Sequence, residues 1–203
     1  MRQRTLVLAA LIAAVPASLA AQNSEKRVVG PPTAVVMGGP EIGNEAPRFS
    51  LGWATSDTTS DGSYSYNLTR DRGKIVVLTF YTQDFTPSAT VQLNRLKERA
   101  ESYGTDVVVI GVSVDPPARH RRFASSLELP YRLLSDPDQE VARAYGVRGA
   151  NGQPKRSVFV IGPDGNVRYA DPRFDPYNDA SFASLDAAVA AARGQTAAPA
   201  AGS

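Results

Sequence analysis

The sequence has 203 residues, with 22 basic and 20 acidic side chains, a hydrophobic fraction of 42% and no cysteine. This length and composition are typical of one globular domain with terminal extensions and argue against a disordered chain. The absence of cysteine excludes disulfides, thiolate metal ligands and a thiol nucleophile, so an ordinary apolar core must stabilise the fold.

The first residues of the chain have the pattern of a secretory signal. Arg2 and Arg4 precede an apolar run over residues 5–15, and small residues follow. This order predicts a signal peptide over residues 1–20, cleaved after Ala20 or the next residue, and an exported protein that is periplasmic or secreted. The apolar run is shorter than the ~20 residues that span a bilayer, so we expect no stable membrane insertion after cleavage. A buried N-terminal helix and an uncleaved anchor are the alternatives.

Two segments of low complexity flank the predicted domain. Residues 21–43 are rich in glycine and proline and predict a flexible linker, and residues 194–203 predict a disordered Ala/Pro tail. The folded domain is expected over residues 44–193. Loss of the signal removes two arginines and no acidic residue, so the net charge of +2 falls to about zero. The charge therefore predicts no nucleic-acid partner.

Within the domain, apolar runs of strand type alternate with amphipathic helices. The strands are expected at residues 75–81, 107–113, 131–134, 157–161 and 167–169. The helices are expected at residues 87–103, 116–127, 139–145 and 179–193. The polar residues 52–71 are expected to form a surface excursion before the core, with room for a short hairpin through Tyr64 and Tyr66. Packing is favoured over a glycan or peptide platform for Trp53 and these tyrosines.

The order of these elements predicts an α/β fold with a mixed central sheet flanked by helices. Pro163-Asp164-Gly165-Asn166 predicts a hairpin between the last two strands. Asp136 and Asp138 precede a helix, so helix capping is their expected role.

The same order resembles the thioredoxin fold, and the local motifs resemble peroxiredoxins of the alkyl hydroperoxide reductase and bacterioferritin comigratory protein types. The resemblance covers nearly all of residues 41–170. It rests on residues 43–51 (GNEAPRFSL), 74–81 (KIVVLTFY), 108–115 (VVIGVSVD), 129–136 (LPYRLLSD), 141–147 (VARAYGV) and 156–161 (RSVFVI).

The resemblance implies a site at the start of the helix that begins at Pro87. In this family a cysteine thiolate, favoured by the helix N-terminus and a nearby arginine, attacks peroxide and becomes a sulfenic acid. The match places Ala89 at the nucleophile, Thr86 at the peroxide-positioning threonine and Arg156 at the arginine. Thr82 stands where the family has proline, and Asn94 where some members carry a second cysteine.

A methyl group is not a nucleophile, and the hydroxyls of Ser88 and Thr90 have no sulfenic state. We therefore expect no catalytic residue and no thiol peroxidase activity. The residual pocket would consist of Thr82, Thr86, Ala89 and Arg156. Two interpretations of Arg156 stay open: a small-anion site shared with helix N–H groups, or a pair with an acidic neighbour such as Asp84.

No metal site and no cofactor are predicted. The single histidine, His120, lies among Arg119, Arg121 and Arg122, and this cationic segment is expected to be a solvated helix face. The leading interpretation is a binding or interaction module with an unknown protein or small-anion partner. A homodimer is also an open possibility. The alternative is an antioxidant oxidoreductase that reduces hydroperoxides, as the resemblance implies.

Overall fold

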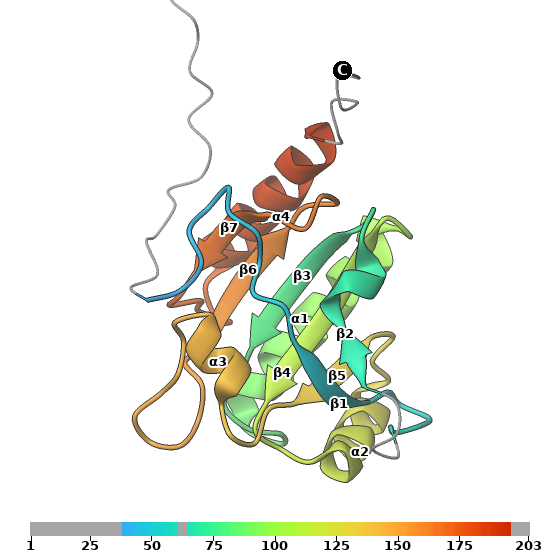
Figure 1. The fold of residues 1–203 in the computed structure, drawn as a ribbon. Helices are drawn as coiled ribbons and strands as arrows, with labels where there is room; N and C mark the ends of the chain where they lie inside the picture. Colours follow the sequence, from blue (N-terminus) through green and yellow to red (C-terminus); the bar gives the residue numbers. More distant parts are fainter. Residues whose placement is uncertain (1–37, 61–64, 196–203) are drawn as a thin grey trace, which may run out of the picture.

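A seven-stranded mixed β-sheet forms the centre of the molecule, with strand order β2-β1-β5-β4-β3-β6-β7 (Figure 1). The structure is a computed structural model that describes residues 38–60 and 65–195. The strands are β1 (Ser50–Ala54), β2 (Tyr66–Asn67), β3 (Ile75–Phe80), β4 (Val107–Ser113), β5 (Arg132–Ser135), β6 (Ser157–Ile161) and β7 (Val167–Asp171). The central strands β3, β4 and β5 are parallel, while β1 and β6 run antiparallel to their neighbours. The predicted α/β class with a mixed sheet is confirmed.

Helices cover both faces of this sheet (Figure 1). They are α1 (Pro87–Tyr103), α2 (Pro117–Leu127), α3 (Glu140–Ala144) and α4 (Asp179–Gly194), with a short 3-10 helix η1 (Leu68–Asp71). The apolar cluster on one face joins the sheet to α1, α2 and α4, and the cluster on the other face joins it to α3 and η1. The predicted arrangement, a central sheet flanked by helices, is therefore confirmed.

The alternation of side chains in β3 explains why five of its six residues are apolar. Ile75 and Val77 enter the cluster with α1, whereas Val76, Leu78 and Phe80 enter the cluster with α3. A strand covered on both faces needs apolar side chains at successive positions.

The predicted limits of α1 are confirmed, and the reason is local. Pro87 occupies the first helical position, where its missing N–H costs no hydrogen bond, and Thr86 is the N-cap. Gly104 follows the helix with φ of +82°, a conformation that glycine adopts easily. The helix therefore begins and ends where its sequence indicates.

The expected surface excursion over residues 52–71 is wrong in part. Residues 52–54 pair with β5 inside the main sheet, and β2 pairs with β1. Ala54, Tyr66 and Leu68 are buried, which confirms packing for Tyr66, while Tyr64 lies outside the described residues. Polar residues dominate the segment by number, but these three apolar side chains join it to the core.

The predicted ends of the chain are described only in part. The signal over residues 1–20 and most of the linker and tail lie outside the described residues. The N–H of Gly43 donates to the carbonyl of Val167 at 2.8 Å, so the domain's contacts begin within the predicted linker. Within the described ranges, no helix combines the length and hydropathy needed to cross a bilayer.

Candidate functional site

One edge of the sheet gathers the chemically interesting residues. The carboxyl ends of the parallel strands β3, β4 and β5 meet there, and each leads to a buried aspartate: Asp84, Asp115 and Asp136. Because β6 is antiparallel to β3, Ser157 pairs with Phe80 and brings the preceding arginine to the same edge. Topology alone thus collects residues that are far apart in the sequence.

The first turn of α1 begins with Thr86. Its hydroxyl accepts from the N–H of Ala89 at 3.3 Å and donates to the carbonyl of Gln83 at 3.0 Å. Ala89, the third helical residue, has an exposed fraction of 0% and joins the apolar cluster. The position that the family resemblance assigns to the nucleophile is therefore a buried methyl group at the helix N-terminus.

Arg156 reaches this turn from the start of β6. Its Nη2 donates to the Ser88 hydroxyl at 2.6 Å. The suggested pair with Asp84 is wrong, because Asp84 faces a different partner described below. The Nε atom of Arg156 is buried and has no hydrogen-bond partner among the described residues. Thr82 is half-buried in the loop before α1.

Few backbone donors are left at this helix end. Pro87 has no N–H, and the N–H of Ala89 already donates to Thr86. Ser88, the second helical residue, also has a backbone N–H, and this N–H has no hydrogen-bond acceptor among the described residues. An anion at this position would therefore depend on Arg156 and Ser88 more than on the helix end.

A buried ionic cluster that the sequence analysis missed lies beside α1. Asp84 and His120 have exposed fractions of 1% and 0%, and His120 Nδ1 lies 2.9 Å from Asp84 Oδ2. The Tyr81 hydroxyl donates to Asp84 Oδ1 at 2.7 Å. Burial raises the pKa of Tyr81 well above its usual value, and the Asp84 charge raises it further, so this hydroxyl keeps its proton.

The expectation of a solvated face for His120 is therefore wrong. Arg121 and Arg122 are exposed as expected, but His120 lies on the opposite side of α2 with Phe123. The spacing of His120, Phe123 and Leu127 at i, i+3 and i+7 is the signal that could have located it. The surrounding arginines concealed that periodicity.

The loop between the cluster and α1 contains a strained residue. Phe85 has φ of +64°, a conformation that costs a bulky L-residue about 1–2 kcal/mol. The centre of its ring lies 4.8 Å from that of Phe123, and the guanidinium of Arg119 lies 5.3 Å above it, while the residue is 48% exposed. The strained turn therefore contacts α2 on one side and faces solvent on the other.

Comparison with known proteins decides the family. The AhpC/TSA family matches residues 42–170. The chain belongs to the AhpC/TSA family. The putative peroxiredoxin bcp of Haemophilus influenzae is 36% identical over 66% of this chain and 86% of that protein. The chloroplastic peroxiredoxin Q of Triticum aestivum is 34% identical over 76% and 69% of the two chains.

A solved structure agrees with this assignment. The crystal structure of peroxidoxin BcpB from Mycobacterium tuberculosis superposes with a TM-score of 0.62 and 27% identity, covering 78% of this chain and 99% of the other. The prediction of a peroxiredoxin-family chain with a thioredoxin-like fold is confirmed.

In this AhpC/TSA-family chain, Gln92 adds a second unsatisfied atom near the candidate site. Its Nε2 donates to the Thr79 hydroxyl at 2.6 Å, and the Thr79 hydroxyl lies 3.4 Å from the carbonyl of Ser157. Gln92 Oε1 is buried without a partner among the described residues. Gln92 Oε1, an acceptor on α1, and Arg156 Nε, a donor next to β6, therefore both lack a hydrogen-bond partner among the described residues.

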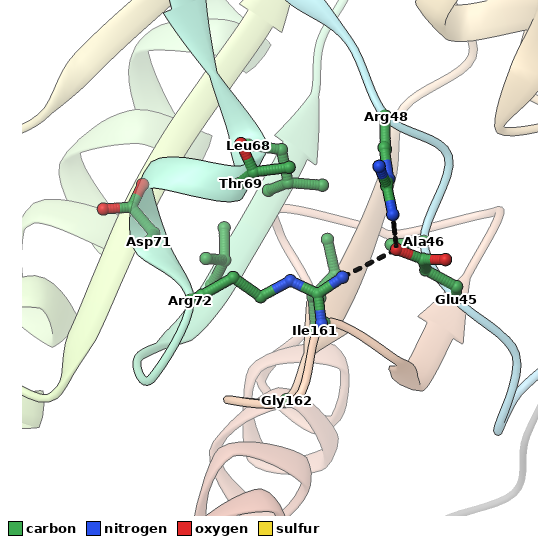
Figure 2. Close-up of a pocket in the computed structure, with 11 residues that line it drawn as sticks. Glu45, Ala46, Arg48, Leu68, Thr69, Asp71, Arg72, Ile161 and Gly162 are labelled. Atoms are coloured by element: carbon green, nitrogen blue, oxygen red, sulfur yellow. Dashed lines mark hydrogen bonds and ion pairs between the residues drawn. The ribbon is translucent and has the colours of Figure 1, made fainter.

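A polar cluster at the other end of β3 has a structural role in this AhpC/TSA-family fold. Figure 2 shows Arg48 and Arg72 both directed at Glu45, at 2.8 and 2.6 Å. The hydrogen bond and the charge of Arg48 lower the pKa of Glu45, and Arg72 contributes less. The cavity beside it has a volume of about 10 Å³, room for one water at most. Within the described residues, no group of three or more potential metal ligands occurs here or elsewhere.

Proposed function

We propose that this chain is an exported, peroxiredoxin-like protein that has lost thiol peroxidase activity and acts as a binding or interaction module. The observation that carries the proposal is Ala89. A methyl group stands at the third residue of α1, and this sequence holds no cysteine. Peroxide reduction by this family needs a thiolate there, and tuning of the surroundings does not replace the missing sulfur.

The small-anion version of this proposal is supported by Arg156. Its guanidinium contacts Ser88, leaves Nε unsatisfied and has no acidic partner among the described residues. A carboxylate or phosphate-type oxygen is the acceptor that such a group binds most strongly. The scarcity of free N–H groups at α1 favours a small anion held mainly by side chains.

The test of lost activity is peroxide consumption by the purified chain without its signal, with dithiothreitol or thioredoxin as reductant. We expect consumption equal to buffer, whereas a cysteine-containing peroxiredoxin run in parallel gives turnover. Turnover that scales with protein concentration would instead favour an antioxidant oxidoreductase. That alternative is supported by the family and by the retained Thr86 and Arg156.

Binding and export need separate tests. Titration of inorganic phosphate or acetate should shift the Arg156 Nε–H resonance, and Arg156→Gln should abolish saturable binding. If the resonance shows no saturable shift at anion concentrations below millimolar, the small-anion version fails. A protein partner is then the remaining candidate, and pull-down from envelope extracts would test for it. Export predicts that protein from the native host begins one or two residues after position 20. The molecular mass of the protein in solution tests whether it forms a homodimer.

A further inference from the structure

Asp84 is held at four points, and three of them come from one short segment. Its N–H donates to Asp115 Oδ2 at 2.7 Å, its carbonyl accepts from Arg119 Nη2 at 3.1 Å, and its carboxylate faces His120. The fourth contact is the Tyr81 hydroxyl. Residues 115–120 therefore hold both the backbone and the side chain of a single loop residue.

The contact with His120 has the geometry of an ion pair. His120 Nδ1 lies 2.9 Å from the Asp84 carboxylate, and Nε2 lies 3.1 Å from the carbonyl of Leu134. The carbonyl of Leu134 only accepts, so Nε2 carries a proton, and an imidazolium would donate to this carbonyl and to an ionised Asp84 at the same time. In that state the charges of His120 and Asp84 compensate each other between α2, β5 and the loop.

The segment that follows Asp84 needs such a restraint. Phe85 adopts the left-handed conformation, and a residue of its kind does so only where the surroundings hold it. The next residue, Thr86, is the N-cap of α1. The strained residue therefore lies directly between Asp84, which residues 115–120 hold, and Thr86, which begins α1.

We propose that the Asp84–His120 pair is a latch through which α2 holds the strained turn at Phe85 and so fixes the start of α1. Release of the latch frees residues 84–90, including Ser88 and Ala89, while the sheet stays folded. The latch is a conformational device of the fold, and it is independent of whether the site binds an anion or a protein.

The unaltered protein offers the first test. Because the sequence contains one histidine, its imidazole signals are unambiguous. We expect both ring nitrogens to be protonated and the Asp84 amide to exchange at least about a hundredfold more slowly than an open loop amide. A neutral imidazole, or an Asp84 amide that exchanges as freely as an open loop, overturns the latch.

Variants supply the second test. Asp84→Asn keeps the shape and removes one charge, and Asp84→Asn with His120→Gln removes both. Amides of residues 84–90 should exchange at least about tenfold faster relative to those of β4 in both variants. Tyr145→Phe, which removes a part-buried hydrogen bond to the Pro47 carbonyl on the other face, is the matched control and should not change this ratio.

The strain gives a readout that general destabilisation does not reproduce. Phe85→Gly and Phe85→Ala both remove the ring, but only glycine adopts positive φ freely. With the latch intact, the folding equilibrium constant should be roughly threefold larger for Gly than for Ala. In the Asp84→Asn background the ratio should fall to one or below. An unchanged ratio, equal acceleration of loop and strand amides, or variants that do not fold would overturn the proposal.

Discussion

Restoring a thiol at position 89 tests the candidate site most directly. Ala89→Cys places sulfur at the third residue of α1, close to the turn that Arg156 contacts through Ser88. A thiolate there gains from the helix N-terminus about 0.3–2 kcal/mol, which lowers the pKa of a thiol by up to about 1.5. Burial acts in the opposite direction, since Ala89 is fully enclosed.

The balance of these effects sets the expected magnitude. A net fall of about one unit from the free-cysteine pKa of 8.5 raises the thiolate fraction at pH 7 from about 3% to about 24%. The added sulfur also crowds a closed site and should cost about 1–3 kcal/mol of stability. We therefore expect slow but measurable peroxide consumption, well below that of a native thiol peroxidase.

The assay is an ultraviolet titration of the thiolate, with mass spectrometry of the sulfenic acid after peroxide treatment. Ala89→Ser is the control for shape, because it adds an oxygen and no redox chemistry. Arg156→Gln in the cysteine variant should raise the thiol pKa again, and Thr82→Pro should increase the rate. A cysteine that titrates at 8.5 or above, with no response to Arg156→Gln, would refute the inference that this turn favours an anion.

Further variants and a pH titration test the packing around the site. Gly111→Ala would bring a Cβ to 2.7 Å from Leu133 and 3.2 Å from Tyr81, so urea denaturation should show a loss of about 1–3 kcal/mol, and an unchanged midpoint would contradict this packing. Asp136→Ala removes the acceptor of two N–H groups in the first turn of α3 and should cost about 1–3 kcal/mol, measured in the same way; a loss below about 0.5 kcal/mol would show that capping contributes little. Burial raises the pKa of six tyrosines: Tyr66, Tyr81, Tyr103, Tyr131, Tyr145 and Tyr169. The folded form keeps protons that the unfolded chain loses above about pH 10, so stability is complete below that pH and falls as the pH rises towards about 12, the raised pKa of Tyr169. Tyrosinate absorbance should then appear together with unfolding, and its appearance in the folded protein near pH 10 would contradict the burial.

Sequence patterns were sufficient for the parts of the fold that depend on local periodicity. The runs at β3 and β4, the proline and glycine that limit α1, and the hairpin around Gly165 could all be predicted, because each depends on neighbouring residues. The family motifs likewise predicted that Ala89 stands at the position of the family's nucleophile. The capping role of Asp136 was also predictable, since it acts on the next few residues.

Only the tertiary structure decided which distant groups meet. Asp84 and His120 are 36 residues apart, and their contact depends on how α2 packs against the sheet. The same holds for β1, which joins β5 only because the sheet is built from non-consecutive strands, and for Arg156, which reaches Ser88 from an antiparallel strand. Periodicity determines which face of an element is apolar, whereas the partner of a buried charge is determined by the packing of whole elements.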